Sequence, residues 1–201
     1  DIDSKSKYAS SKGLGESSVM KNFPGAIILR PSIVFGFEDK FFNRFASMAR
    51  LSPILPIVGG NTKFQPVYVD DVARAAFLGI NNDVQAGIYE LGGPEVASFN
   101  ELMRRMLKII LRRRLIVNLP FWIASLMGTG FDLGKAISLG IIRGPITLDQ
   151  VLNLKNDNVV SREEKTFKDL GIEPKALETI LSEYLWKYRP AGEFSDSEKQ
   201  N

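Results

Sequence analysis

The sequence contains no cysteine and no histidine. The absence of cysteine excludes disulfides, thiolate nucleophiles and iron–sulfur ligands, and it fits a reducing compartment. Together, the two absences exclude ordinary zinc sites and every nucleophile that depends on a Ser–His or Cys–His pair. Any acid–base chemistry must therefore use tyrosine, lysine, aspartate or glutamate.

The net charge does not predict a protein that binds nucleic acid, and the uninterrupted apolar segments are too short to predict a membrane-spanning helix. With 26 basic and 23 acidic residues, the net charge of +3 is too balanced to predict a nucleic-acid partner. The polar residues from Asp1 to Lys7 do not form a secretory signal. The apolar segment 115–142 is interrupted by Asn118 and Pro120 and later by charges, so we expect no transmembrane helix. A length of 201 residues suits one globular domain, or a domain with a smaller lobe.

Helical and strand-like segments alternate along the first half of the chain. Short apolar runs bounded by proline and glycine predict strands, and longer amphipathic runs predict helices. We expect helices over about 8–21, 39–50, 70–80 and 98–111, and strands over 26–30, 65–69 and 88–91. The first strand is expected to be buried on both faces. The stretch 51–60 is expected to be a loop, and Asp70 is expected to cap the third helix. This alternation predicts an α/β fold.

The second half of the chain is expected to be mainly helical. Capping boxes, which pair a serine with a glutamate three residues later, are predicted for Ser98 with Glu101 and for Ser161 with Glu164. The remaining helices are expected over about 121–127, 132–139, from 147 onwards and over 173–188. The polar tail 189–201 is expected to be disordered.

Tyr8 and Lys12 lie four residues apart in the first predicted helix. At that spacing two side chains share a helix face, with Cβ atoms about 5–6 Å apart. A nearby ammonium favours the phenolate and lowers the pKa of a tyrosine, so Tyr8 can exchange a proton with a carbonyl or alcohol near neutral pH. Such a pair is common by chance, and the alternative is an incidental pair on a solvated helix.

Two further segments follow this Tyr-x-x-x-Lys pair in order. The first is Arg30-Pro31-Ser32-Ile33-Val34-Phe35-Gly36, and the second is Tyr68-Val69-Asp70-Asp71-Val72-Ala73. This succession resembles the extended and atypical short-chain dehydrogenase/reductases. Three later segments resemble one branch of that superfamily, the nucleotide-binding accessory subunit of respiratory complex I and its bacterial relatives: 119–122, 145–151 and 154–161. The resemblance runs from Tyr8 to about Pro190.

The resemblance implies a fold and a division of the chain. It implies the C-terminal part of a doubly wound, NAD(P)-binding Rossmann-type sheet and a mainly helical lobe. The sheet part would be 1–93, with a substrate-side excursion at about 37–64, and the lobe would be 94–188.

The resemblance also implies site residues. Tyr8 and Lys12 would line the nicotinamide ribose. The segment after the next strand would lie against the nicotinamide through Pro31, Ser32, Ile33 and Val34.

A dinucleotide site also needs a glycine-rich turn after the first strand. No Gly-x-Gly-x-x-Gly occurs in this sequence, and the pairs Gly59–Gly60 and Gly92–Gly93 are expected to be ordinary turns. We therefore expect the C-terminal portion of a longer protein that binds NADP or NAD. The 201 residues alone are expected to bind a dinucleotide weakly or not at all.

Two functions follow from the resemblance. The first is an accessory or assembly component of NADH:ubiquinone oxidoreductase with a structural nucleotide, in the cytoplasm or mitochondrial matrix, peripheral on the inner membrane. The second is an active NAD(P)-dependent oxidoreductase, epimerase or dehydratase acting on a nucleotide sugar or similar alcohol, with Tyr8 as proton donor or acceptor and Lys12 orienting the ribose.

Charged side chains offer weaker signals for the second function. A nucleotide sugar needs basic residues for its diphosphate, and the candidates are Lys63, Arg74 and Arg143, which the sequence does not separate from surface charge. Asp70 and Asp71 could form a metal site or a carboxylate pair. A helix start is the favoured interpretation, because acidic residues there complement the helix dipole. No metal site is predicted.

A basic set precedes the apolar segment 115–126 and consists of Arg104, Arg105, Lys108, Arg112, Arg113 and Arg114. No aromatic residues interleave the charges, which disfavours nucleic acid. Because Phe121 and Trp122 follow, one interpretation is docking on complex I or on a membrane surface through Arg112, Arg113 and Arg114. The other is a solvated helix face beside a buried lobe.

Overall fold

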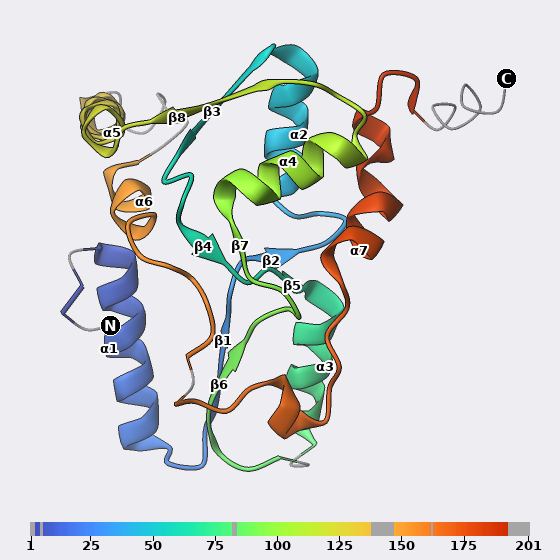
Figure 1. Cartoon of the computed structure of the whole chain (residues 1–201). Helices are drawn as coiled ribbons and strands as arrows, with labels where there is room; N and C mark the ends of the chain where they lie inside the picture. Colours follow the sequence, from blue (N-terminus) through green and yellow to red (C-terminus); the bar gives the residue numbers. More distant parts are fainter. Residues whose placement is uncertain (1–2, 5, 82–83, 138–146, 162, 193–201) are drawn as a thin grey trace, which may run out of the picture.

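The computed structural model describes residues 3–4, 6–81, 84–137, 147–161 and 163–192 (Figure 1). The helices are α1 (Lys7–Asn22), α2 (Phe42–Leu51), α3 (Val69–Ile80), α4 (Phe99–Ile109), α5 (Phe121–Ile137), α6 (Leu148–Asn153) and α7 (Leu177–Tyr184), with the 3-10 helices η1 (Phe167–Leu170) and η2 (Leu185–Tyr188). The strands are β1 (Ile27–Pro31), β2 (Val34–Phe35), β3 (Ile54–Val58), β4 (Lys63–Phe64), β5 (Val67–Tyr68), β6 (Gly87–Leu91), β7 (Ala97–Ser98) and β8 (Leu115–Leu119). The chain is α/β, as predicted.

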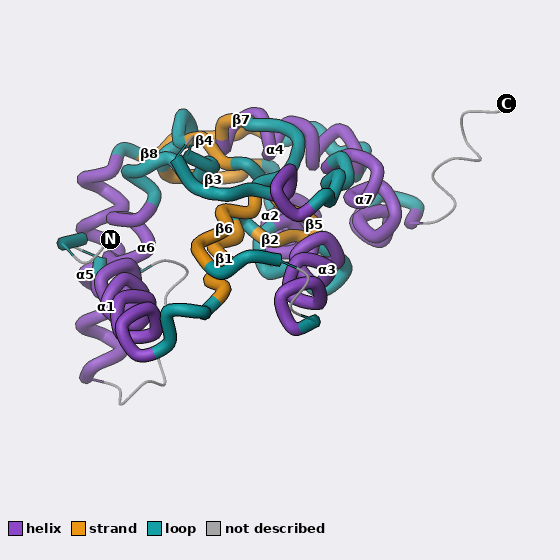
Figure 2. Tube along the Cα trace, turned by 90° about the horizontal axis from the view of Figure 1, so that it is seen from below, coloured by secondary structure: helices purple, strands orange, loops and turns teal. Residues whose placement is uncertain are grey.

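The strands form pairs, and most of the pairs are parallel. Strand β1 runs parallel to β6, with Ile27 opposite Gly87 and Pro31 opposite Leu91. The pairs β2–β5 and β3–β8 are also parallel, and β4–β7 is antiparallel. Helices α1 and α3 lie on opposite sides of the β1–β6 pair (Figures 1 and 2).

The prediction that the first strand is buried on both faces is wrong. Residues Ile27 to Arg30 are only half-buried. Within the described chain β1 pairs with β6 alone. No residue of the neighbouring helix α1 is buried, so this helix packs only loosely beside the strand. The continuous apolar run fits a central strand, but these partners cover only part of it.

Two main apolar cores and a small third one, formed by Val58, Ala124 and Val151, hold the described elements. The larger core lies where α2, α4 and α7 meet and includes Phe42, Leu102, Met106 and Leu181. In α4 the buried positions recur every three or four residues, so one face of the helix packs inward. The second main core lies between the β1–β6 pair, α3 and η1. The division of the chain at residue 93 stays a prediction.

One prediction of local structure is wrong at the β3–β8 pair, and one strand was not predicted. The stretch 51–60 contains a strand where a loop was expected, and 115–119 is a strand that precedes the first of the helices expected in 115–142. In β3, Leu55 and Ile57 are buried while Ile54 and Pro56 are exposed, which is the alternation of a strand. A proline is compatible with β3 because the strand pairs on one side only in the described chain.

Helix caps divide into confirmed and wrong predictions. The box of Ser98 with Glu101 is confirmed, and a helix begins directly after Thr147 as expected. The box of Ser161 with Glu164 is wrong, because the Ser161 N–H donates to Glu90 Oε2, and a later pair caps η1 instead. Asp70 is not a cap but lies in the first turn of α3, with Tyr68 at the cap position.

Some expectations lie outside the described residues. They are the end of the predicted helix 132–139, Arg143, and most of the predicted disordered tail, 193–201. In the part of the chain that is described, no helix has the length and apolar character needed to cross a bilayer.

Candidate functional site

Helix α1 brings Tyr8 and Lys12 together, as the spacing predicted. The helix begins after Ser6, whose Oγ accepts a hydrogen bond from the Ala9 N–H at 3.2 Å. Lys12 Nζ lies 6.0 Å from the centroid of the Tyr8 ring. The Tyr8 side chain is 62% exposed, so its hydroxyl is accessible to a bound molecule.

Polar contacts hold α1 against the rest of the chain. Arg30 Nη2 in β1 lies 2.6 Å from Glu16 Oε2, and the Lys7 N–H donates to Asp149 Oδ1 at 2.7 Å. The hydrogen bond with Glu16 raises the pKa of Arg30, and the nearby carboxylates of Glu90 and Glu164 act in the same direction. Arg30 therefore positions the helix that carries Tyr8 and Lys12, a role that no local pattern in the sequence indicates.

The segment Pro31 to Val34 continues from the carboxyl end of β1. The Ser32 N–H donates to the Leu91 carbonyl at 2.9 Å, and Ser32 Oγ donates to the Asn158 carbonyl at 2.8 Å. Val34 pairs with Val67 across β2 and β5. The segment is thus fixed by its neighbours on both sides. Within the described chain, no hydrogen bond joins it to the Tyr8 and Lys12 side chains.

Ile33 of this segment faces a cavity of about 380 Å³. The other walls come from α2, β3, β4, α4, β8 and the α5–α6 pair, whose positions can be followed in Figure 1. Most of the lining is apolar, and four phenylalanines form much of it: Phe41, Phe45, Phe64 and Phe99. Among the described residues, Arg44 is the one charged side chain that lines this cavity.

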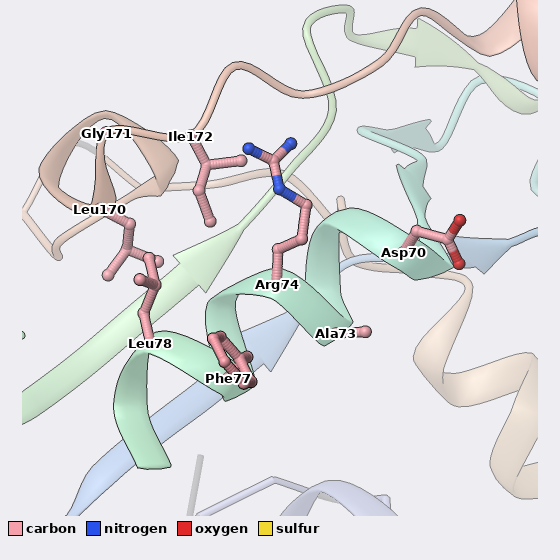
Figure 3. Close-up of a pocket in the computed structure, with 8 residues that line it drawn as sticks. All are labelled: Asp70, Ala73, Arg74, Phe77, Leu78, Leu170, Gly171 and Ile172. Atoms are coloured by element: carbon pink, nitrogen blue, oxygen red, sulfur yellow. The ribbon is translucent and has the colours of Figure 1, made fainter. Parts of the chain in front are cut away.

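Arg74 lies in a different place from the one expected for a diphosphate contact. It lines a hollow of about 620 Å³ between α3 and η1, beside Phe77, Leu78 and Ile172 (Figure 3). Its Nη1 lies 3.7 Å from Asp71 Oδ1. Helix α3 is on the far side of the β1–β6 pair from α1, so the structure does not bring Arg74 to Tyr8.

Asp71 is fully buried and joins α3 to the start of the last helical segment. Its Oδ2 accepts a hydrogen bond from the Lys175 N–H at 2.8 Å, and Arg74 approaches its Oδ1. A buried carboxylate with these partners has a structural role at the helix start.

The basic set is partly structural. Arg105 pairs with Glu95 at 2.6 Å and with Glu178 at 2.9 Å, which raises the pKa of Arg105. Arg112 Nε donates to the Tyr188 carbonyl and Arg114 Nε to the Ala49 carbonyl. The two partners are 76 residues apart in the chain in the first contact and 65 residues apart in the second, so no local sequence pattern predicts these hydrogen bonds.

The basic set also surrounds a surface hollow of about 450 Å³. Arg104, Lys108 and Arg113 line it together with the exposed Leu115. Burial lowers the pKa of Arg112, and the positive charges of Arg114 and Arg50 add to that shift. Cations therefore crowd this end of α4, which favours an acidic partner.

No protein-family model matches the chain. It is 35% identical over 196 residues to NADH dehydrogenase (ubiquinone) 1 alpha subcomplex subunit 9, mitochondrial, of Arabidopsis thaliana, covering 95% of this chain and 49% of the relative. It is 34% identical to the NADH-ubiquinone oxidoreductase 40 kDa subunit, mitochondrial, of Neurospora crassa, over 94% of this chain and 48% of the relative. The chain is similar in sequence to these complex I subunits over almost all of its own length. It spans about half the length of the curated relatives that it matches.

A third relative of the chain carries the name of an enzyme. A ceramide reductase of Caulobacter vibrioides is 28% identical over 117 residues, which cover 57% of this chain and 37% of that protein.

Solved structures of low sequence identity show the fold of the chain. dTDP-glucose 4,6-dehydratase of Bacillus anthracis, in complex with NAD, superimposes with a TM-score of 0.57 at 14% identity, over 94% of this chain and 51% of its own. UDP-glucose 4-epimerase of Thermus thermophilus, also in complex with NAD, gives 0.55 at 16% identity, over 90% and 52%. These similarities confirm the predicted α/β fold of Rossmann type, and at this level of identity they show the fold alone.

Proposed function

We propose that the chain is part of an accessory subunit of NADH:ubiquinone oxidoreductase in the mitochondrial matrix. The observation that carries this proposal is the 35% identity to the Arabidopsis subunit over 95% of the chain. In this proposal the longer protein holds NADP or NAD as a structural group. The chain contributes one side of that nucleotide site, and the 201 residues alone bind it weakly or not at all.

The geometry at the end of β1 supports a nucleotide in this place. Ligands of parallel α/β sheets bind beyond the carboxyl ends of the strands, and Pro31 to Val34 occupies that position. Tyr8 and Lys12 offer a hydroxyl and an ammonium on one exposed face. Both groups donate hydrogen bonds, which suits the hydroxyls of a ribose.

Each group then has a defined part in holding the nucleotide. Lys12 donates to the ribose and orients it, Tyr8 fixes the same sugar, and Pro31, Ser32, Ile33 and Val34 present a rigid wall to the nicotinamide. A bound nicotinamide supplies hydride chemistry only where a substrate reaches it. Without a substrate, the bound nucleotide stabilises the fold by mass action.

Loss of the ammonium should release the nucleotide from the full-length protein. We expect Lys12→Met to weaken NADPH binding by about 10- to 100-fold, which corresponds to losing a charge-assisted hydrogen bond of about 1.5–3 kcal/mol. The measurement is isothermal titration of apo protein with NADPH. Lys21→Met, at the far end of the same helix, is the matched control and should bind as the wild type does. Equal affinities of the two variants would contradict the assignment of Lys12.

A second candidate is an active reductase, epimerase or dehydratase. It is favoured by the exposed Tyr8–Lys12 pair and by the enzyme names of the ceramide reductase and the two solved structures. In that case Tyr8 passes a proton to or from the substrate oxygen. The full-length protein would then turn over an alcohol or nucleotide sugar, and Tyr8→Phe would abolish turnover while the nucleotide stays bound. Copurifying nucleotide without turnover supports the accessory function.

We also propose that the hollow at the end of α4 docks on complex I. Arg113 is the sharpest probe, because Arg112 and Arg114 also hold backbone carbonyls and their loss would disturb the fold. We expect Arg113→Glu to lower the fraction of protein that comigrates with complex I several-fold, since a like charge then faces an acidic partner. Lys21→Glu on α1 is the control of equal charge change. If the two variants comigrate equally, the hollow is not the docking surface.

A further inference from the structure

The cavity beside Ile33 has the chemistry of a binding site for a hydrocarbon chain. Its volume of about 380 Å³ lies within the range of about 300–1,000 Å³ for small-molecule sites. Its walls come from seven helices and strands, and Ile33, Met48 and Leu119 are among the apolar residues that line it. A cavity with such walls offers water few hydrogen-bond partners, so an apolar ligand is favoured over solvent.

The aromatic residues give this cavity a rigid wall. Phe41 stacks against Phe45 and Phe99 with ring centroids 5.4 Å apart in both pairs, and Phe64 lies 5.8 Å from Phe99. Phe64 and Phe99 are buried, while Phe41 and Phe45 are half-buried and keep part of their surface open. Burying such surface against a ligand contributes about 25 cal/mol per Å².

Polar side chains lie at the rim of this cavity. Arg44, Gln150 and Asn158 line it and are exposed. A guanidinium at the rim of an apolar cavity suits a carboxylate or phosphate head group whose chain lies inside. The arrangement matches a long-chain amphiphile with its charged end towards solvent.

The same lining disfavours a nucleotide sugar. A diphosphate needs several cations, and in the described part of the chain Arg44 is the one cation among the lining residues. Arg74 lies in the hollow of α3, and Lys63 does not line the cavity. Away from the polar rim, a sugar would leave its hydroxyls against phenylalanine and methionine without partners.

We propose that this cavity binds the hydrocarbon chain of an anionic lipid, with a long-chain fatty acid as its simplest form. Ile33 links the cavity to the segment proposed to lie against the nicotinamide. Tyr8 and Lys12 do not line the cavity, so the lipid site is distinct from the proposed ribose contacts. Where the protein is an enzyme, the cavity makes its substrate a lipid.

The test uses the full-length protein and a dansyl-labelled fatty acid, whose fluorescence rises on entering an apolar site. We expect saturable binding that oleate displaces and UDP-glucose does not. Met127→Trp should weaken the probe at least ten-fold, because Met127 lines the cavity, is 39% exposed, and can place a larger side chain there without repacking the core. Leu126→Trp is the matched control, because Leu126 is the next residue of α5, is 70% exposed and does not line the cavity.

NADPH titration of the same variants separates this proposal from the proposed function. Both variants should bind NADPH as the wild type does. If the wild-type full-length protein binds the fatty acid but not NADPH, the proposed nucleotide site alone is overturned. Absence of saturable probe binding, equal affinity in the two variants, or displacement by UDP-glucose would overturn the lipid site.

Discussion

Replacing Gly93 by alanine should lower the free energy of unfolding by about 3 kcal/mol. A Cβ atom at this position would overlap the carbonyl oxygen of Pro66. Hydrogen bonds join the two backbone segments at this point. The Gly93 N–H donates to the Gln65 carbonyl at 3.2 Å, and Gln65 Nε2 donates to the Gly93 carbonyl at 2.7 Å. Neither backbone can move away without breaking these bonds and displacing β5, whose Val67 is fully buried.

Urea unfolding followed by circular dichroism measures this effect. The matched control is Gly15→Ala, because Gly15 lies inside α1 and has open space where the Cβ would be. Alanine should stabilise that helix by about 0.5–1 kcal/mol, since glycine loses more backbone freedom on folding. The two substitutions should therefore differ in sign. A wild-type midpoint for Gly93→Ala would show that the close approach of Gly93 to Pro66 is not a constraint.

Most helices were predicted from local signals in the sequence, because amphipathic periodicity and capping boxes both depend on residues three or four positions apart. Ser98 with Glu101 is such a case. The box of Ser161 with Glu164 failed because tertiary partners compete for both residues: the Ser161 N–H meets Glu90, and Glu164 lies 3.6 Å from Arg30. A motif of two residues cannot exclude partners that are distant in the chain.

The β3–β8 pair was missed for a related reason. Ile54 pairs with Leu115, so the partner strand lies about 60 residues away, and two prolines in 51–60 favoured a loop. The alternation of buried and exposed residues in β3 is not visible in the sequence, because exposed Ile54 and buried Leu55 are both apolar.

The candidate site shows the same contrast between local and distant contacts. The proximity of Tyr8 and Lys12 was predicted, because helix geometry alone places residues four apart on one face. The anchoring of α1 by Arg30 depends on Glu16, which a turn separates from it. The cavity was not predicted, because Phe41 and Phe64 lie on different elements whose meeting depends on the whole fold.

Asp39 connects the start of α2 to Tyr184 of α7 through hydrogen bonds. We expect Asp39→Ala to lower the free energy of unfolding by about 2–4 kcal/mol. Asp39 Oδ1 accepts hydrogen bonds from the N–H groups of Phe41, Phe42 and Asn43 at the start of α2. Its Oδ2 accepts from the hydroxyl of Tyr184, which is buried in α7. Burial and this hydrogen bond raise the pKa of Tyr184, so the phenol stays a neutral donor. Alanine would remove the cap and leave that buried hydroxyl without its acceptor.

Two variants separate the contributions of the cap and the phenol. Tyr184→Phe removes the donor and keeps the cap, so it should cost about 1 kcal/mol. Glu38→Ala changes the exposed neighbouring carboxylate and should stay within about 0.5 kcal/mol of the wild type. Since α2 carries Phe45 and Met48 of the cavity wall, Asp39→Ala should also weaken the fatty acid probe, whereas Glu38→Ala should not. Equal unfolding midpoints for Asp39→Ala and Glu38→Ala would show that α2 is held by its apolar face alone.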